Sequence, residues 1–190
     1  MPELHITGDA TADALLSEEP LALLVGMLLD QQVPMETAFA GPAKIRERLG
    51  AFDAATLAST DPEKLADVFK QTPAVHRFPG SMAERTHALC AALVAEWGGR
   101  AERIWTDGDP DGATVLARVR ALPGFGEQKA KIFVALLGKQ YGLTAPGWES
   151  AAGSYGDAGS YRSVADIVDS SSLAKVREFK KAAKAAAKGE

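Results

Sequence analysis

Along most of this chain, apolar residues recur at the three- to four-residue spacing that places them on one side of a helix. Asp13 to Leu29 becomes apolar almost all round toward its end, which predicts a helix buried by its neighbours. At Asp61-Pro62-Glu63, an N-cap aspartate and a first-turn proline precede another such pattern. No window alternates apolar and polar residues as a strand does. The pattern therefore predicts an all-α protein.

Proline and glycine interrupt the helical pattern at several points. Pro34 is expected to open a helix that the Gly41-Pro42 pair breaks before it resumes. Ser81 and Glu84 have the spacing of a capping box, which predicts that a helix starts there and stops at glycines 98–99.

The second half of the chain predicts two consecutive helices and then a stretch rich in turns. Residues 111–120 form one helical pattern, and a second pattern ends near Tyr141, with Gly142 as its cap. Residues 145–160 are rich in glycine, and Ser163-x-x-Asp166 predicts the start of another helix.

The composition limits the classes of site that the chain can build. A chain of 190 residues forms one large domain or two small lobes that share a core. One cysteine, Cys90, excludes an internal disulfide, a zinc finger and a Cys-ligated iron–sulfur cluster. The three histidines lack metal-ligand spacing, so we expect no metal site.

Neither a membrane span nor a leader is predicted. The longest apolar run, Leu21 to Leu29, is far shorter than the ~20 residues that a span needs. The start of the chain lacks the basic segment of a signal peptide. We therefore expect a cytoplasmic protein without membrane contact.

The net charge of −4 argues against indiscriminate binding of nucleic acid, but the charge is unevenly distributed. From Ser171 onward the chain is net basic. Its charged residues there are Lys175, Arg177, Lys180, Lys181, Lys184 and Lys188, against Glu178 and Glu190. Alanine and lysine favour a solvated helix in this tail, and attraction to phosphate is the alternative interpretation.

The strongest candidate motif is the turn Leu122 to Gly126, which reads Leu-Pro-Gly-Phe-Gly and runs straight into a helix. Gly124 and Gly126 can adopt positive φ and keep side chains out of the way. The turn leaves backbone N–H groups exposed at the start of the next helix, where an anion is attracted. Lys129 and Lys131 lie in its first turns. The motif predicts a clamp on a phosphodiester backbone that ignores base sequence.

A nucleotide-binding glycine-rich loop is the competing interpretation of this turn. Gly124-x-Gly126 lacks a third glycine, and no hydrophobic strand precedes it. No Gly-Lys-Ser/Thr sequence occurs in the chain. These departures favour the backbone clamp.

The order of the segments resembles the helix–hairpin–helix superfamily (HhH-GPD) of DNA glycosylases, which remove damaged or mispaired bases in base-excision repair. Residues 122–132 look like the family's hairpin, and residues 28–32 look like its Leu-Ser-Gln-Gln-type segment. Glycines 98–99 fit a family position two elements before the hairpin. The similarity covers most of residues 20–150.

The resemblance implies two all-α lobes that flank a cleft. Residues 20–142 would form a six-helix barrel ending in the hairpin, and residues 1–19 with 143–190 would form the second lobe. In the family the hairpin amides grip a phosphate, often with a bound monovalent cation, and the target nucleotide is extruded into the cleft. The implied partner is double-stranded DNA with a damaged or mispaired base, bound by a monomer. In a prokaryote the protein would associate with the nucleoid.

The resemblance also names a DNA-facing set of residues. Gln31 and Gln32 match the residues that fill the space left by the extruded base, although a polar helix end that meets solvent is the alternative. Phe125 is expected to pack inward and hold the turn in shape. The full DNA-facing set is Gly124, Phe125, Gly126, Gln128, Lys129, Lys131, Gln31 and Gln32.

Two family positions decide the chemistry. The Schiff-base lysine of strand-cleaving members falls at Gln128, and Lys129 points elsewhere because a helix turns about 100° per residue. The resemblance therefore implies a monofunctional enzyme. The family's catalytic aspartate falls near Glu149, with Asp157 and Asp166 as further candidates, and an exposed loop carboxylate is an equally good interpretation of Glu149.

Three functional hypotheses follow, and Glu149 separates the first two. The first is a monofunctional DNA glycosylase without a redox metal or an iron–sulfur cluster. The second is a DNA-binding module that keeps the hairpin and has lost the carboxylate. The glycosylase hypothesis is favoured if Glu149 lines the cleft opposite the hairpin, and the DNA-binding module is favoured if Glu149 faces solvent. An unrelated helical scaffold is the third.

Overall fold

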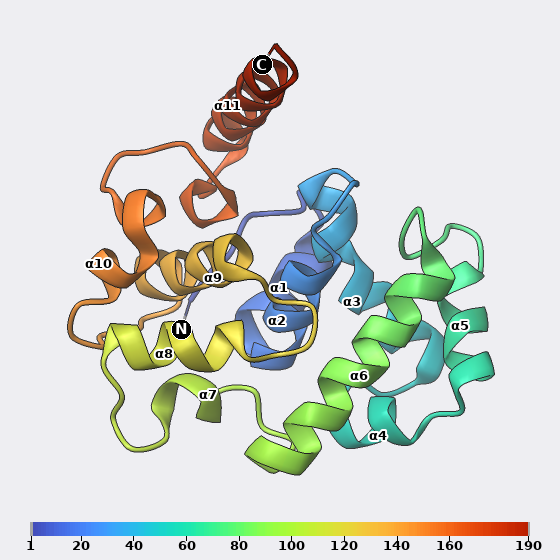
Figure 1. The fold of residues 1–190 in the computed structure, drawn as a ribbon. Coiled ribbons are helices and arrows are strands. Elements are labelled where there is room, and N and C mark those ends of the chain that lie inside the picture. Colours follow the sequence, from blue (N-terminus) through green and yellow to red (C-terminus); the bar gives the residue numbers. More distant parts are fainter. Residues whose placement is uncertain (1, 190) are drawn as a thin grey trace.

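The computed structural model describes residues 2–189, and over that range it is all-α, as predicted (Figure 1). The helices are α1 (Ala10–Glu18), α2 (Pro20–Leu29), α3 (Met35–Leu49), α4 (Ala54–Ser59), α5 (Pro62–Lys70), α6 (Pro79–Trp97), α7 (Arg103–Thr106), α8 (Gly112–Arg120), α9 (Glu127–Gln140), α10 (Trp148–Ala152) and α11 (Ser170–Lys188), with 3-10 helices η1 (Gly153–Gly156) and η2 (Val164–Asp166). No strand occurs among these described residues.

The apolar helix α2 lies at the centre of the fold. Every residue from Leu21 to Leu29 is buried, as expected for a helix covered on all sides. Helices α1 and α3 pack on α2, and α6 and α9 also contact it. Helices α4 and α5 pack on α6, whereas α8, α10 and η2 pack on α9. The core thus joins two helical groups through α2, and the predicted lobe boundaries stay a prediction.

The segment from Asp13 to Leu29 forms two helices rather than one. Glu19 has an extended conformation (φ −114°, ψ 105°) between α1 and α2. The following Pro20 disfavours helical geometry at Glu19 and then starts the new helix itself. Asp13 is buried in α1, where its carboxylate accepts hydrogen bonds from the Ile6 and Thr7 N–H groups.

Two other expected boundaries were wrong. Helix α3 runs unbroken through Gly41 and Pro42, because both are buried and Gly41 packs closely against Leu29 of α2. Tertiary packing therefore outweighs the helix-breaking tendency of the pair. Helix α6 starts at Pro79 instead of Ser81, since the first-turn proline sets the boundary.

Helix α11 begins at a capping box and then projects from the body (Figure 1). The Asp169 carboxylate accepts the Ser172 N–H at 2.7 Å, and only Ser172 and Val176 of the helix are buried. Among residues 2–189, no helix combines the length and apolarity that crossing a bilayer requires.

Candidate nucleic-acid interface

The predicted hairpin joins α8 to α9. The Phe125 N–H donates to the Leu122 carbonyl at 3.2 Å and closes the turn. Gly126 is the N-cap of α9 and provides no side-chain cap. The first N–H groups of α9 therefore lack an N-cap acceptor, and the 14-residue helix directs its positive end toward this opening. This arrangement can bind an anion.

The two hairpin glycines have different surroundings. Gly124 has φ +84°, and a methyl group there would lie 2.4 Å from Leu28 Cδ1 of α2. A methyl group at Gly126 would meet nothing within 4 Å. Gly124 is thus required by backbone geometry and by close packing, whereas Gly126 leaves open space at the start of α9.

Phe125 lies in the core of the protein. Its side chain is 5% exposed and packs edge-on against Phe133, with ring centroids 6.1 Å apart. The ring therefore anchors the turn to α9, and its contribution to an interface is limited to its backbone.

The Lys129 side chain, expected to face DNA, is instead directed into the protein in this structure. Its ammonium donates to the carbonyls of Met27 (2.8 Å), Leu28 (3.1 Å) and Asp30 (3.3 Å). Two of these carbonyls belong to the last turn of α2 and the third to its C-cap residue, so the lysine caps the end of that helix. Burial lowers the pKa of Lys129 to about 8. Lys131 instead pairs with Glu127 at 3.1 Å and keeps 34% of its side chain exposed.

The Gln31–Gln32 segment lies beside the hairpin, although nearly 100 residues separate them in sequence. The Lys129 ammonium donates to the Leu28 carbonyl, and Gly124 of the hairpin packs on the Leu28 side chain. Gln31 donates to the Leu28 carbonyl at 2.9 Å and accepts from Arg85 at 2.8 Å. Gln32 is exposed, with φ +59°. The structure thus brings the two predicted segments together and leaves Gln32 as the projecting side chain.

Gln128, which the family resemblance places at the lysine position of strand-cleaving members, is the second residue of α9. Its amide donates to the Tyr155 hydroxyl of η1 at 2.9 Å. Tyr155 therefore meets the start of α9 through its hydroxyl. The neighbouring Lys129 directs its amine into the end of α2, so neither residue presents an amine at this position.

Glu149 lies in α10, at the end of the α8–α9 pair that is remote from the hairpin (Figure 1). The preceding Trp148 packs on Gly138, which is twelve residues beyond Gly126 and therefore ~18 Å further along α9. Trp148 thus acts as a lid over the core. Glu149 is exposed, and its carboxylate has no hydrogen-bond or ion-pair partner among residues 2–189.

The two further carboxylate candidates differ in their surroundings. Asp166 is 4% exposed and pairs with Lys139 at 2.6 Å. It also accepts the Arg162 N–H and completes the capping box of η2. This carboxylate is therefore fully engaged in structure. Asp157 is exposed, and its backbone carbonyl accepts from Lys139.

Asp30 is a buried charged residue beside this interface that the sequence patterns did not predict. Its side chain is 8% exposed and lies 3.9 Å from Lys180 of α11. Burial raises the pKa of Asp30, and the positive charges of Lys180 and Lys129 oppose that rise. An aspartate directly after the apolar α2 was a visible signal of a buried charge. Its lysine partner, 150 residues later, was not predictable from spacing.

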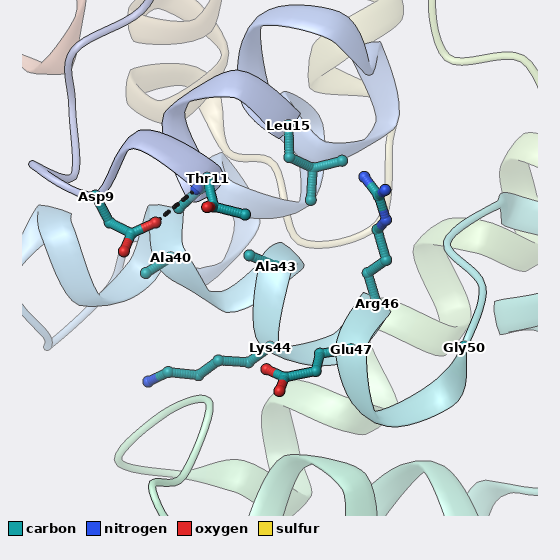
Figure 2. A pocket seen from close by; sticks show the side chains of 10 residues that line it. Asp9, Thr11, Leu15, Ala40, Ala43, Lys44, Arg46, Glu47 and Gly50 are labelled. Carbon is teal, nitrogen blue, oxygen red and sulfur yellow. Dashed lines mark hydrogen bonds between the residues drawn. The ribbon is translucent and has the colours of Figure 1, made fainter.

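A hollow of about 550 Å³ lies elsewhere, between α1 and α3 (Figure 2). Leu15, Ala40 and Ala43 line it with apolar groups, and Lys44 and Glu47 add charged groups. No residue of the hairpin or of Gln31–Gln32 contributes to it. Within residues 2–189, no three His, Cys, Asp or Glu side chains gather into a metal site.

Comparison with known proteins identifies a family. The family model for the HhH-GPD superfamily base excision DNA repair protein matches residues 25–187. No curated protein sequence matches the chain. A trapped endonuclease III–DNA covalent intermediate aligns with TM-score 0.47 and 17% identity over 62% of this chain and 47% of its own. A thermostable thymine-DNA glycosylase aligns with TM-score 0.45 and 14% identity over 85% of this chain and 70% of its own.

Proposed function

Because the chain belongs to the HhH-GPD superfamily of base excision DNA repair proteins, we propose that it binds double-stranded DNA with a damaged or mispaired base. The single observation that carries this proposal is the opening at the start of α9. Its N–H groups have no N-cap side chain, and Gly126 leaves free space in front of them. A phosphate can approach such amides closely without reading base sequence.

The exposed Gln32 beside this opening is proposed to enter the duplex. Gln31 holds the segment against α6 through Arg85, so the loop that carries Gln32 is fixed at its base. The family resemblance also implies a monovalent cation at the hairpin, and no step of the proposal depends on one.

The chemistry that fits this site is hydrolysis of the N-glycosidic bond without strand cleavage. A Schiff base needs an amine, and Gln128 supplies an amide at the family's lysine position. Lys129 cannot replace that lysine while its ammonium contacts the α2 carbonyls. Base release should therefore leave an intact abasic site, and borohydride should trap no covalent adduct.

A non-catalytic DNA-binding protein is the second candidate function, and the position of Glu149 favours it. The exposed carboxylate follows Trp148 at the end of α9 remote from the hairpin. A carboxylate assists glycosidic cleavage only when it lies beside the breaking bond. On this second proposal the protein marks or holds a lesion and releases no base.

A panel assay separates the two candidates. Duplexes with uracil, alkylated, oxidised or mismatched bases are incubated with wild type and with Glu149→Gln. Base release by wild type that the Gln variant loses assigns the carboxylate role to Glu149. Equal release by both proteins transfers that role to another group, with Asp157 tested next. Binding without release from any lesion establishes the second candidate.

The anion site itself is tested by Gly126→Asp, with Gly126→Asn as the neutral control. An N-cap aspartate satisfies the free N–H groups of α9 and should stabilise the helix by about 0.5–1 kcal/mol. The same carboxylate excludes a phosphate, so the affinity for duplex DNA should fall about tenfold or more. Unchanged DNA affinity in Gly126→Asp would remove the hairpin from the interface.

A further inference from the structure

Helix α11 carries its positive charge on one side. It contains six basic residues and one acidic residue, within a chain whose net charge is −4. At about 100° per residue, five of the basic residues lie within a sector of about 100°. We call this sector the basic stripe; it consists of Arg177, Lys180, Lys181, Lys184 and Lys188. Lys175 and Glu178 lie outside the stripe.

The stripe begins beside the proposed DNA interface. Arg177 pairs with Glu36 of α3 at 2.6 Å, and Lys180 approaches Asp30 at 3.9 Å. Asp30 and Glu36 flank the loop that carries Gln32. The backbone of Asp30 also receives the Lys129 ammonium from the first turn of α9. The base of α11 is thus tied to the same loop that adjoins the hairpin.

The rest of the stripe has no partner within the described chain. All residues from 177 to 189 are exposed, and Lys181, Lys184 and Lys188 form no ion pair with residues 2–189. Lys188 lies eleven residues beyond Arg177, or about 17 Å further along the helix. Duplex DNA carries one negative charge per about 1.7 Å of its axis, so several phosphates fall within that length.

The composition of α11 favours a polyanion over another protein or a membrane. Beyond Phe179 the helix contains only lysine and alanine, so burial would remove little apolar surface from water. Phe179 is 41% exposed, and the Arg162 guanidinium stacks over one part of it, 5.6 Å from the ring centroid. Charge is therefore the dominant surface property of α11 beyond Phe179.

We propose that the basic stripe of α11 is a second contact with the DNA backbone, along the duplex beside the phosphate bound by the hairpin. This inference rests on the proposed DNA-binding function. The contact needs no base recognition, because lysine ammonium groups attract phosphates of any sequence. It gives the acidic protein a local surface that suits DNA, while the rest of the molecule repels it.

The test compares two double variants with equal loss of charge. Lys184→Gln with Lys188→Gln removes the free end of the stripe, and Lys64→Gln with Lys70→Gln removes two exposed lysines of α5. Glutamine is also a good helix former, so both helices should persist, which circular dichroism verifies. Affinity for duplex DNA is measured by anisotropy across a salt series. The stripe variant should flatten the slope of log affinity against log salt by up to ~1.8, at ~0.9 per lost contact, and the control should not.

The outcomes separate this inference from the proposed function. Equal slopes in the stripe variant and the α5 control overturn the second contact, and the function stands if Gly126→Asp still weakens binding. A wild type that binds no duplex DNA overturns both. Binding to phosphatidylserine vesicles is measured in parallel. Stripe-dependent binding to vesicles with an unchanged DNA salt slope would assign α11 to a membrane surface and overturn the DNA contact.

Discussion

Both ends of the α8–α9 pair are built on glycine, but the chain fills only one of them completely. At the remote end, a methyl group on Gly112 would lie 2.5 Å from Trp148 Cα, and one on Gly138 would lie 2.3 Å from the Trp148 indole. At the hairpin end, Leu28 fills the space beside Gly124, whereas the space beside Gly126 stays open. The protein's own atoms therefore fill the space beside Gly112, Gly124 and Gly138, whereas the space beside Gly126 is open.

The difference shows why a glycine alone does not identify a binding site. A missing side chain allows close approach in every case, and the neighbouring atoms decide what approaches. Trp148 occupies the remote end and makes it part of the core. The hairpin end keeps free N–H groups and open space together, which is the combination that an anion needs.

The largest expected effect lies at the filled end. Trp148→Ala should lower the free energy of unfolding by about 2–3 kcal/mol, less than full aromatic burial because the indole is half-buried. Gly138→Ala alone should cost about 1–3 kcal/mol through overpacking. In the Trp148→Ala background it should cost nothing, because the indole it would strike is gone. Urea unfolding of the four proteins measures this coupling, and additive effects would contradict the contact.

At the hairpin end, the two glycines should respond differently to the same substitution. Gly124→Ala should cost about 1–2 kcal/mol, because its φ of +84° disfavours a side chain and the methyl strikes Leu28. Gly126→Ala should cost only about 0.5 kcal/mol, since its φ of −83° suits alanine and its surroundings are open. Urea unfolding compares them directly. Equal losses would show that the open end is as tightly packed as its neighbour.

The sequence predicted what depends on local signals. The helices at 61–70 and 111–120, the hairpin and the capping boxes at Ser163 and Asp169 all depend on residues a few positions apart, and of these only the box at Asp169 was not anticipated. The unbroken α3 was not predictable, because its Gly41-Pro42 pair is held by packing against α2.

The candidate site was predicted only in part, for the same reason. The family resemblance brought Gln31–Gln32 and the hairpin into one hypothesis, and the structure places them side by side. The direction of the Lys129 side chain depends on carbonyls 99–102 residues away. The partnership of Asp30 with Lys180 depends on where α11 docks. Neither contact produces a periodic pattern in the sequence.

The hairpin end should also show a pH dependence that acts through Lys129. Its pKa is about 8 in the folded protein, below the ordinary 10.5, so the unfolded chain holds more protons between these values. The contribution of Lys129 to the free energy of unfolding should therefore rise with pH above 8, by at most about 1.4 kcal/mol per pH unit. Lys129→Met removes this contribution, and the matched control Lys131→Met leaves it in place.

The measurement is the difference in unfolding free energy between wild type and each variant at pH 7 and pH 9, from urea titrations. For Lys129→Met the difference should grow at pH 9 by up to about 1 kcal/mol, because only wild type sheds the buried proton on folding. For Lys131→Met it should stay constant. A constant difference in both would mean that the three carbonyl contacts outweigh burial and keep the ammonium charged. In that case the hairpin end would be tied to α2 by a permanent charge rather than by a titrating one.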